Sequence, residues 1–215
     1  MAKVLLTGFD PFGGSDVNPA WEAVKSFESK AVAGVELVIQ MIPTVFHKSI
    51  QTLEATIAQE KPDIVICVGQ AGGRTDITVE RVAINVDDAR IPDNEGNQPI
   101  DVPIYAEGPA AYWSTLPIKA IVNNLRKAGI PASVSQTAGT FVCNHLFYGL
   151  AHLIATKYPR VRGGFIHIPY LPQQAALLSN APSMGVEQVI QALEVAVTTT
   201  ISCQQDIVMA DGQLN

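Results

Sequence analysis

The stretch VELVIQMIPTVFHKSIQTLEATIAQEKPDIVICVG, residues 35–69, decides the expected fold. It opens with an apolar run at 35–42, continues through a helical pattern at 49–58, and closes with a second apolar run at 63–69. Two apolar runs joined by a helix-length segment are typical of a β-α-β unit. We therefore expect a largely parallel sheet that carries helices on both faces.

The segments around this unit continue the alternation. An apolar run at 4–9 comes before it, and Asn18 followed by Pro19 predicts a helix start, with Asn18 as N-cap and Pro19 in the first turn. Residues 75–90 alternate between apolar and polar types, which predicts one or two strands with a polar face. The remaining predictions are helices at 117–129, 143–159 and 186–201, and a strand at 162–172.

Length and composition place the chain in the compact globular class. Its 215 residues are 47 % hydrophobic and 16 % charged, so we expect a single domain over residues 1–215. The net charge of −6 and the absence of a Lys/Arg cluster argue against nucleic acid and anionic membrane surfaces as partners. No apolar stretch reaches 18 residues, and we expect a cytoplasmic protein.

The segment 87–117 is rich in proline and glycine and follows neither the helical nor the strand period. Long irregular stretches inside compact domains often serve as lids, binding loops or interfaces. The sequence leaves these three roles open for this segment.

Cysteine usage points to single thiols. Cys67, Cys143 and Cys203 are odd in number and widely spaced, which fits neither a disulfide framework nor a paired zinc site. Cys143 falls where SQTAGTFV ends and an apolar helical pattern begins, and the N-terminus of a helix favours a thiolate. The alternative is that Cys143 is core filler, because free cysteine is often buried.

A thiol nucleophile needs a base, and four histidines are available. His145 lies two residues after Cys143, a rotation of about 200° along a helix, so its side chain is expected on the opposite side. His152 follows on that same face, and we expect solvent or partner contacts for both. His47 comes just before a helix and is expected at the surface.

His167 is the better candidate because it lies near the end of an apolar strand, where α/β sheets gather their sites. The alternative is a hydrogen-bonded structural histidine. Glu80 lies between Val79 and Arg81 in a predicted strand, and strand alternation can turn its side chain inward to orient His167. The alternative is a Glu80 on the surface, which a register shift of one residue would produce.

Three aspartates are weaker candidates for the same orienting role. They are Asp76, Asp87 and Asp88.

The glycine-rich segment GFDPFGGS, residues 8–15, follows the first strand but lacks both P-loop and dinucleotide spacing. It offers Phe9 and Phe12 as walls of a small apolar pocket. A second glycine loop, GQAGGR at 69–74, carries free backbone groups and the amide of Gln70.

Taken together, four motifs resemble those of the pyroglutamyl peptidase I family of cysteine peptidases, in order along essentially the whole chain. They are GFDPFGG, GQAGGRTDITVERVAIN, SQTAGTFVCNHLFYGL and GFIHIPYLP. The resemblance implies a three-layer α/β/α sandwich around a mixed, mostly parallel sheet, similar to that of nucleoside phosphorylases. It also implies peptide substrates with an N-terminal pyroglutamyl residue, no metal or cofactor, and a homo-oligomer, often a tetramer.

The resemblance also implies roles for single residues. Cys143 is the expected nucleophile, His167 the general base and then acid, and Glu80 the carboxylate that orients His167. For substrate binding we expect aromatic walls from Phe9, Phe12 and Phe141, and a hydrogen bond from Gln70. Arg90 is a further expected donor to the oxyanion.

Two other functions stay open at this point. One is a phosphorylase-like enzyme that binds a nucleoside or phosphate through GFDPFGG. The other is a non-enzymatic ligand-binding or structural sandwich with three inert cysteines.

Overall fold

The computed structural model describes residues 1–30 and 32–212. Its main sheet has six strands in the order β2-β1-β3-β8-β4-β7, and β5 and β6 form a separate two-stranded sheet. The strands are β1 (Ala2–Phe9), β2 (Val35–Ile42), β3 (Ile64–Gln70), β4 (Ile77–Glu80), β5 (Val82–Ile84), β6 (Ala111–Trp113), β7 (Ala132–Ser135) and β8 (Arg162–Ile168).

Neighbouring strands of the main sheet run parallel except for β4 and β8, which run antiparallel. The β-α-β unit predicted at 35–69 is confirmed as β2, α2 and β3, with β1 paired between the two strands. The sheet is therefore mixed and mostly parallel, as predicted.

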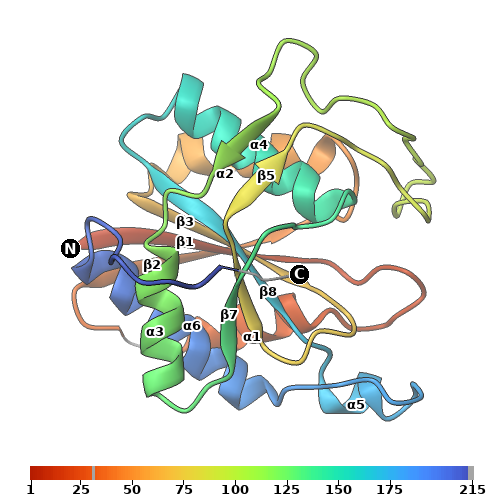
Figure 1. Ribbon diagram of the computed structural model, residues 1–215. Helices are drawn as coiled ribbons and strands as arrows, with labels where there is room; N and C mark the ends of the chain where they lie inside the picture. Colours follow the sequence, from red (N-terminus) through yellow and green to blue (C-terminus); the bar gives the residue numbers. More distant parts are fainter. Residues whose placement is uncertain (31, 213–215) are drawn as a thin grey trace.

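Helices cover both faces of the sheet (Figure 1). They are α1 (Pro19–Phe27), α2 (Lys48–Glu60), α3 (Ile118–Lys127), α4 (Val142–Thr156), α5 (Pro172–Ala175) and α6 (Val186–Ser202). Helices α2 and α4 lie on one face, and α1, α3 and α6 on the other. The three-layer α/β/α arrangement is thereby confirmed.

Strand alternation explains why the core has two halves. Val4 and Leu6 of β1 pack with the α1, α3 and α6 layer, whereas Leu5 between them packs with the α2 and α4 layer. Successive side chains of a strand point to opposite faces, so one buried strand supplies both halves.

Local capping follows the sequence signals. The Asn18 side chain accepts a hydrogen bond of 3.0 Å from the backbone N–H of Ala20, and Pro19 opens α1. Gly129 follows α3 with a φ of 76°, a conformation that glycine adopts without strain. Both predicted helix boundaries are confirmed.

The segment 75–90 forms two strands, β4 and β5, as predicted, and Thr78 and Glu80 form a polar face of β4 that is buried. All four residues of β4 are buried because this strand lies inside the sheet, between β8 and β7. The segment 87–117 is largely irregular, with β6 as its one strand, and it exposes the apolar side chains of Ile100 and Trp113.

Among the described helices, none is both long enough and apolar enough to cross a lipid bilayer.

Candidate active site

Cys143 lies in the first turn of α4, above the carboxyl end of β3. The helix begins at Val142, and Phe141 at the N-cap supplies no side-chain hydrogen bond. A Cβ atom placed on Gly69 would lie 3.0 Å from Sγ of Cys143 and 2.7 Å from the ring of Phe165. The thiol therefore packs directly over a strand end where only glycine fits.

His167 lies on the strand next to this glycine. In the parallel register of β3 and β8, Gly69 is opposite His167, and Cys67 is opposite Phe165. Residues that face each other in a parallel pair point to the same side of the sheet, and neighbouring strands are about 4.8 Å apart. The register thus brings the imidazole of His167 to the side of the sheet where the thiol of Cys143 lies.

Glu80 contacts the Nδ1 side of the His167 imidazole. His167 Nδ1 lies 2.8 Å from Oε1 of Glu80, whose side chain is fully buried. The antiparallel pairing of β4 with β8, with Thr78 opposite His167, brings the carboxylate to this position. Since an ionised carboxylate only accepts hydrogen bonds, Nδ1 carries the proton and Nε2 is left as an acceptor.

The protonation states follow from burial and charge. Burial opposes ionisation of Glu80, but hydrogen bonds with His167 and Ser135 and the charge of Arg74 hold its pKa below the usual value. Burial lowers the pKa of His167, against the opposing effect of Glu80. The resting pair is therefore an ionised carboxylate with a neutral imidazole.

The thiol of Cys143 differs from the expectation. Burial, with a smaller contribution from Glu80, raises its pKa to about 12, although the charge of Arg74 acts in the opposite direction. The low pKa expected from the helix N-terminus is therefore wrong for the resting protein, because loss of water outweighs the helix dipole. Cys143 starts as a neutral thiol and needs a base.

Sequence reasoning missed Arg74, which ends the loop GQAGGR. Its Nη1 lies 2.6 Å from Oε1 of Glu80 and also contacts the hydroxyl of Thr78, and its Nη2 donates to the carbonyl of Thr137 at 2.9 Å. The available signal was an arginine just before the strand that carries the candidate carboxylate.

Of the expected substrate-binding residues, Phe12 and Phe141 come together, with ring centroids 6.2 Å apart. Phe46, which was not predicted, packs edge-on against Phe141 at 5.4 Å. Gln70 ends β3, and its Oε1 accepts a hydrogen bond of 3.2 Å from Nε2 of Gln174. This contact leaves the amide N–H groups of Gln70 available to a ligand.

Of the other two expected residues, Phe9 lies in the core and Arg90 lines a cavity beside Phe141. Phe9 is 2 % exposed and packs in the core beside Phe165, so its prediction as a pocket wall is wrong. Strand β1 continues to this residue and turns its side chain beneath the α2 and α4 layer. Arg90 is exposed and lines a cavity of about 440 Å³ with Gly139, Thr140 and Phe141, among others.

The prediction of a solvent-facing or partner-facing His145 is also wrong. This residue is fully buried, its Nδ1 lies 2.7 Å from Oδ2 of Asp87, and its Nε2 accepts from the backbone N–H of His47. Helical geometry did separate it from Cys143, but α4 is buried on that side too. His47 is exposed at the start of α2, which confirms its predicted surface position.

His152 is partly buried instead of free on the surface. Its ring stacks on Tyr105 with centroids 4.1 Å apart, and its Nδ1 lies 3.0 Å from the hydroxyl of Tyr112. Asp87 pairs with His145, Asp88 is exposed, and Asp76 lies before β4, so Glu80 is the acid that meets His167.

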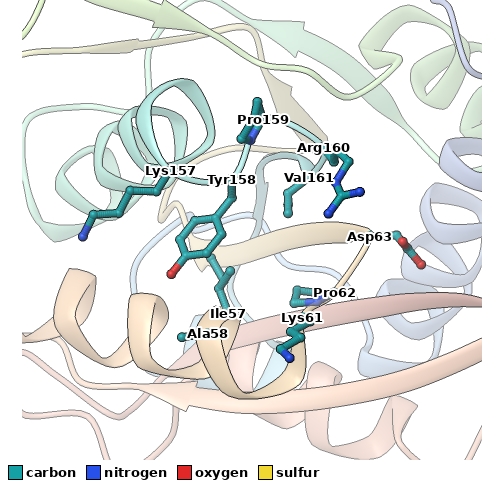
Figure 2. A pocket seen from close by; sticks show the side chains of 10 residues that line it. All are labelled: Ile57, Ala58, Lys61, Pro62, Asp63, Lys157, Tyr158, Pro159, Arg160 and Val161. Atoms are coloured by element: carbon teal, nitrogen blue, oxygen red, sulfur yellow. The ribbon is translucent and has the colours of Figure 1, made fainter.

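A further cavity of about 680 Å³ lies away from these residues (Figure 2). Lys61, Lys157 and Tyr158 are among the side chains that line it, where α2 and α4 end. This end of the molecule is opposite the carboxyl ends of β3 and β8, and none of the expected site residues lines the cavity. Within the described residues, no group of three or more His, Cys, Asp or Glu side chains could hold a metal ion.

Comparisons with known proteins agree with this fold. A family model described as pyroglutamyl peptidase matches residues 2–203. The chain is similar to the pyrrolidone-carboxylate peptidase of Brevibacillus brevis, 63 % identical over 215 residues and covering 100 % of both chains. It is 61 % identical over 212 residues to that of Bacillus cytotoxicus, covering 99 % of each.

Solved structures give the same result. Pyroglutamyl peptidase I of Bacillus amyloliquefaciens superposes with a TM-score of 0.94 at 56 % identity, covering 96 % of this chain and 100 % of that one. The pyrrolidone carboxyl peptidase of Thermococcus litoralis superposes with a TM-score of 0.93 at 40 % identity, covering 98 % and 100 %. Both comparisons confirm the predicted fold class.

Proposed function

Because this chain belongs to the pyroglutamyl peptidase family, we propose that it removes an N-terminal pyroglutamyl residue from peptides with Cys143 as nucleophile. The observation that carries the proposal is the buried pair of His167 and Glu80 on the strands beside the Cys143 thiol. The full-length similarity to named pyrrolidone-carboxylate peptidases supports the substrate class.

In the acylation step, His167 Nε2 takes the proton of the Cys143 thiol as sulfur attacks the pyroglutamyl carbonyl carbon. A neutral thiol beside a neutral imidazole supports general-base activation, since the pKa of Cys143 is raised by burial and that of His167 is lowered. The imidazolium then gives this proton to the leaving amine nitrogen. The amide C–N bond breaks and a thioester remains on Cys143.

Deacylation reverses the roles. His167 takes a proton from water as the oxygen attacks the thioester carbonyl, and the imidazolium returns this proton to sulfur as the C–S bond breaks, which releases pyroglutamate and restores the thiol. Glu80 accepts the Nδ1–H bond throughout and stabilises the imidazolium that forms in each step. The chain's own side chains supply each proton transfer, so the proposal includes no metal or cofactor.

The oxyanion is stabilised at the start of α4. The first N–H groups of a helix have no acceptor within it, and Phe141 offers no side-chain cap, so the Cys143 N–H is suited to the developing charge. Arg90 is retained as a second donor in the proposal, which requires its exposed side chain to turn toward the substrate carbonyl.

Selectivity arises from a pocket for a neutral lactam. Phe12 and Phe141 form an aromatic wall, and the amide of Gln70, held through its oxygen by Gln174, donates to the ring carbonyl. A prolyl residue lacks that carbonyl and leaves the donor unsatisfied, which disfavours it.

We also propose the domain organisation, the oligomeric state and the location of the enzyme. We infer a single catalytic unit over residues 1–215, a homo-oligomer by similarity to the family, and a cytoplasmic location. The exposed apolar side chains of Ile100 and Trp113 in the irregular segment support a role for it as an interface. The three free thiols support a reducing compartment.

The experiment compares hydrolysis of pyroglutamyl and prolyl chromogenic amides by the wild type and by three variants. The wild type releases the chromophore from the pyroglutamyl amide only, whereas Cys143→Ala, Cys143→Ser and His167→Ala release none and keep the wild-type circular dichroism spectrum. Cys203→Ser is the matched thiol control and keeps full activity. Full activity in Cys143→Ala, or phosphate-dependent cleavage of a nucleoside by the wild type, contradicts the proposal.

A further inference from the structure

Arg74 contacts the same carboxylate oxygen that holds the imidazole. Oε1 of Glu80 lies 2.6 Å from Nη1 of Arg74 and 2.8 Å from Nδ1 of His167. The second oxygen, Oε2, is buried without a hydrogen-bond partner. The hydrogen bonds from Arg74 and His167 therefore both act at one oxygen of the Glu80 carboxylate.

The guanidinium is itself held in place. It contacts the hydroxyl of Thr78 on β4 and donates to the carbonyl of Thr137, in the segment that leads from β7 to α4. The Arg74 side chain is only 26 % exposed, and it lines a cavity of about 420 Å³ that includes Ser135 and Thr137. A planar fork fixed at three acceptors is a rigid support for a carboxylate.

Two charged groups act on the pKa of His167. They are Glu80 from β4 and Arg74 from the loop before it, whereas the Cys143 thiol is neutral. Glu80 favours the imidazolium, and the positive charge of Arg74 opposes it. Arg74 thus offsets part of the increase that Glu80 causes in the pKa of His167.

We propose that Arg74 is a positioning residue for the peptidase reaction: it fixes Glu80 behind His167 and keeps His167 free of a second proton until the thiol supplies one. The inference rests on the proposed function, because it assigns His167 as the base. Arg74 contacts the oxygen of Glu80 that is hydrogen-bonded to the imidazole, so it acts on His167 through Glu80.

The test is Arg74→Gln, measured by kcat and KM against pH with a pyroglutamyl amide. We expect kcat to fall about 10-fold with KM unchanged. Arg74 lowers the pKa of both His167 and Cys143, so its loss moves the acidic limb of kcat/KM upward by about half to one pH unit. Arg74→Lys retains the charge and keeps the limb near its wild-type position.

Arg126→Gln is the matched control, since it also removes an arginine from an ion pair, that with Asp211, on the same cavity. We expect Arg126→Gln to leave the acidic limb of the kcat/KM profile at its wild-type pH. A limb that stays in place or moves downward in Arg74→Gln overturns the proposal, as does an equal shift in Arg126→Gln. If Arg74→Gln does not fold, a limb displaced in Arg74→Lys overturns it.

Alkylation separates this proposal from the proposed function. The rate of Cys143 modification by iodoacetamide also rises as His167 becomes available as a base, and it needs no peptide. The same upward shift of that profile in Arg74→Gln supports the role of Arg74 even if the pyroglutamyl amide is not cleaved. An unshifted alkylation profile contradicts it.

Discussion

His145 and Asp87 form a second buried imidazole–carboxylate pair, with Nδ1 and Oδ2 2.7 Å apart, on the same helix that carries Cys143. Unlike His167, this histidine has both ring nitrogens occupied by protein, because Nε2 accepts from the backbone N–H of His47. With no nitrogen left for a proton transfer, the pair serves to hold the start of α2 and the segment after β5 against α4.

We therefore expect His145→Ala to destabilise the fold without removing the chemistry. Loss of the imidazole leaves the buried carboxylate of Asp87 and the N–H of His47 unpaired, at a cost of about 2 to 3 kcal/mol in the free energy of unfolding. Thermal unfolding followed by circular dichroism should show Tm lowered by roughly 5 to 10 °C. Loss of kcat in the folded fraction at low temperature, with Tm unchanged, contradicts this assignment.

Gly69→Ala tests the close packing of the thiol over β3. The added methyl would lie 2.7 Å from the ring of Phe165 and 3.0 Å from Sγ of Cys143, so the thiol or the ring must move. We expect a fall in kcat of about 100-fold, because displacement of a reacting atom by about 1 Å has effects of that size. Gly185→Ala is the control, since the nearest neighbour of its added methyl would be 3.7 Å away. If Gly69→Ala is as active as Gly185→Ala, the thiol is not closely packed over β3.

Glu80→Gln tests the orientation of His167. A glutamine amide is neutral, and it can turn either its oxygen or its NH₂ group toward Nδ1, so the tautomer with a free Nε2 acceptor is no longer enforced. We expect kcat to fall about a thousandfold, measured by chromophore release. Asp88→Asn removes an exposed carboxylate and should leave kcat unchanged. Comparable losses in the two variants are incompatible with a specific role for Glu80.

The lowered pKa of His167 predicts how activity and stability change with pH. An imidazole in the unfolded chain has a pKa of about 6.5, and burial holds that of His167 below this value. As the pH falls from 7 toward 5, the unfolded state takes up a proton that the folded state resists, so stability decreases. The same shift places the acidic limb of kcat/KM below pH 6.5.

Denaturant unfolding at several pH values checks this prediction. His167→Gln should flatten the loss of stability between pH 7 and 5, although His152, whose pKa burial also lowers, contributes a remaining slope. An acidic limb at or above pH 7 in the wild type contradicts the prediction. Glu80, with its lowered pKa, adds its own loss only at more acidic pH, as its carboxylate is protonated.

Much of the fold could be predicted because the signals are local. Apolar runs and helical periods depend on residues a few positions apart, and Asn18 with Pro19, or Gly129, mark helix ends through their own backbone preferences. Cys143 and His167 could also be identified as candidates, since each lies near the end of a predicted element. Glu80 was a candidate because strand alternation can turn it inward, and the motifs around all three resemble one family.

Other features depend on contacts between distant segments. The sequence at β4 alternates as if one face met water, yet the insertion of this strand between β8 and β7 buries both faces. Phe9 was expected to face a ligand but is covered by the α2 and α4 layer. Neither outcome can be seen from neighbouring residues, because burial depends on what packs on top.

By itself, then, the sequence determined the α/β class and the helix starts and stops, and it singled out a thiol, an imidazole and a carboxylate as candidates for the reactive set. Tertiary structure alone decided their protonation states and partners. The register of β3, β8 and β4 brings Glu80 to His167, places Arg74 on the same carboxylate oxygen, and removes water from Cys143. Arg74 lies only six residues from Glu80, but Glu80 and His167 are 87 residues apart, and no local pattern of residues encodes their contact.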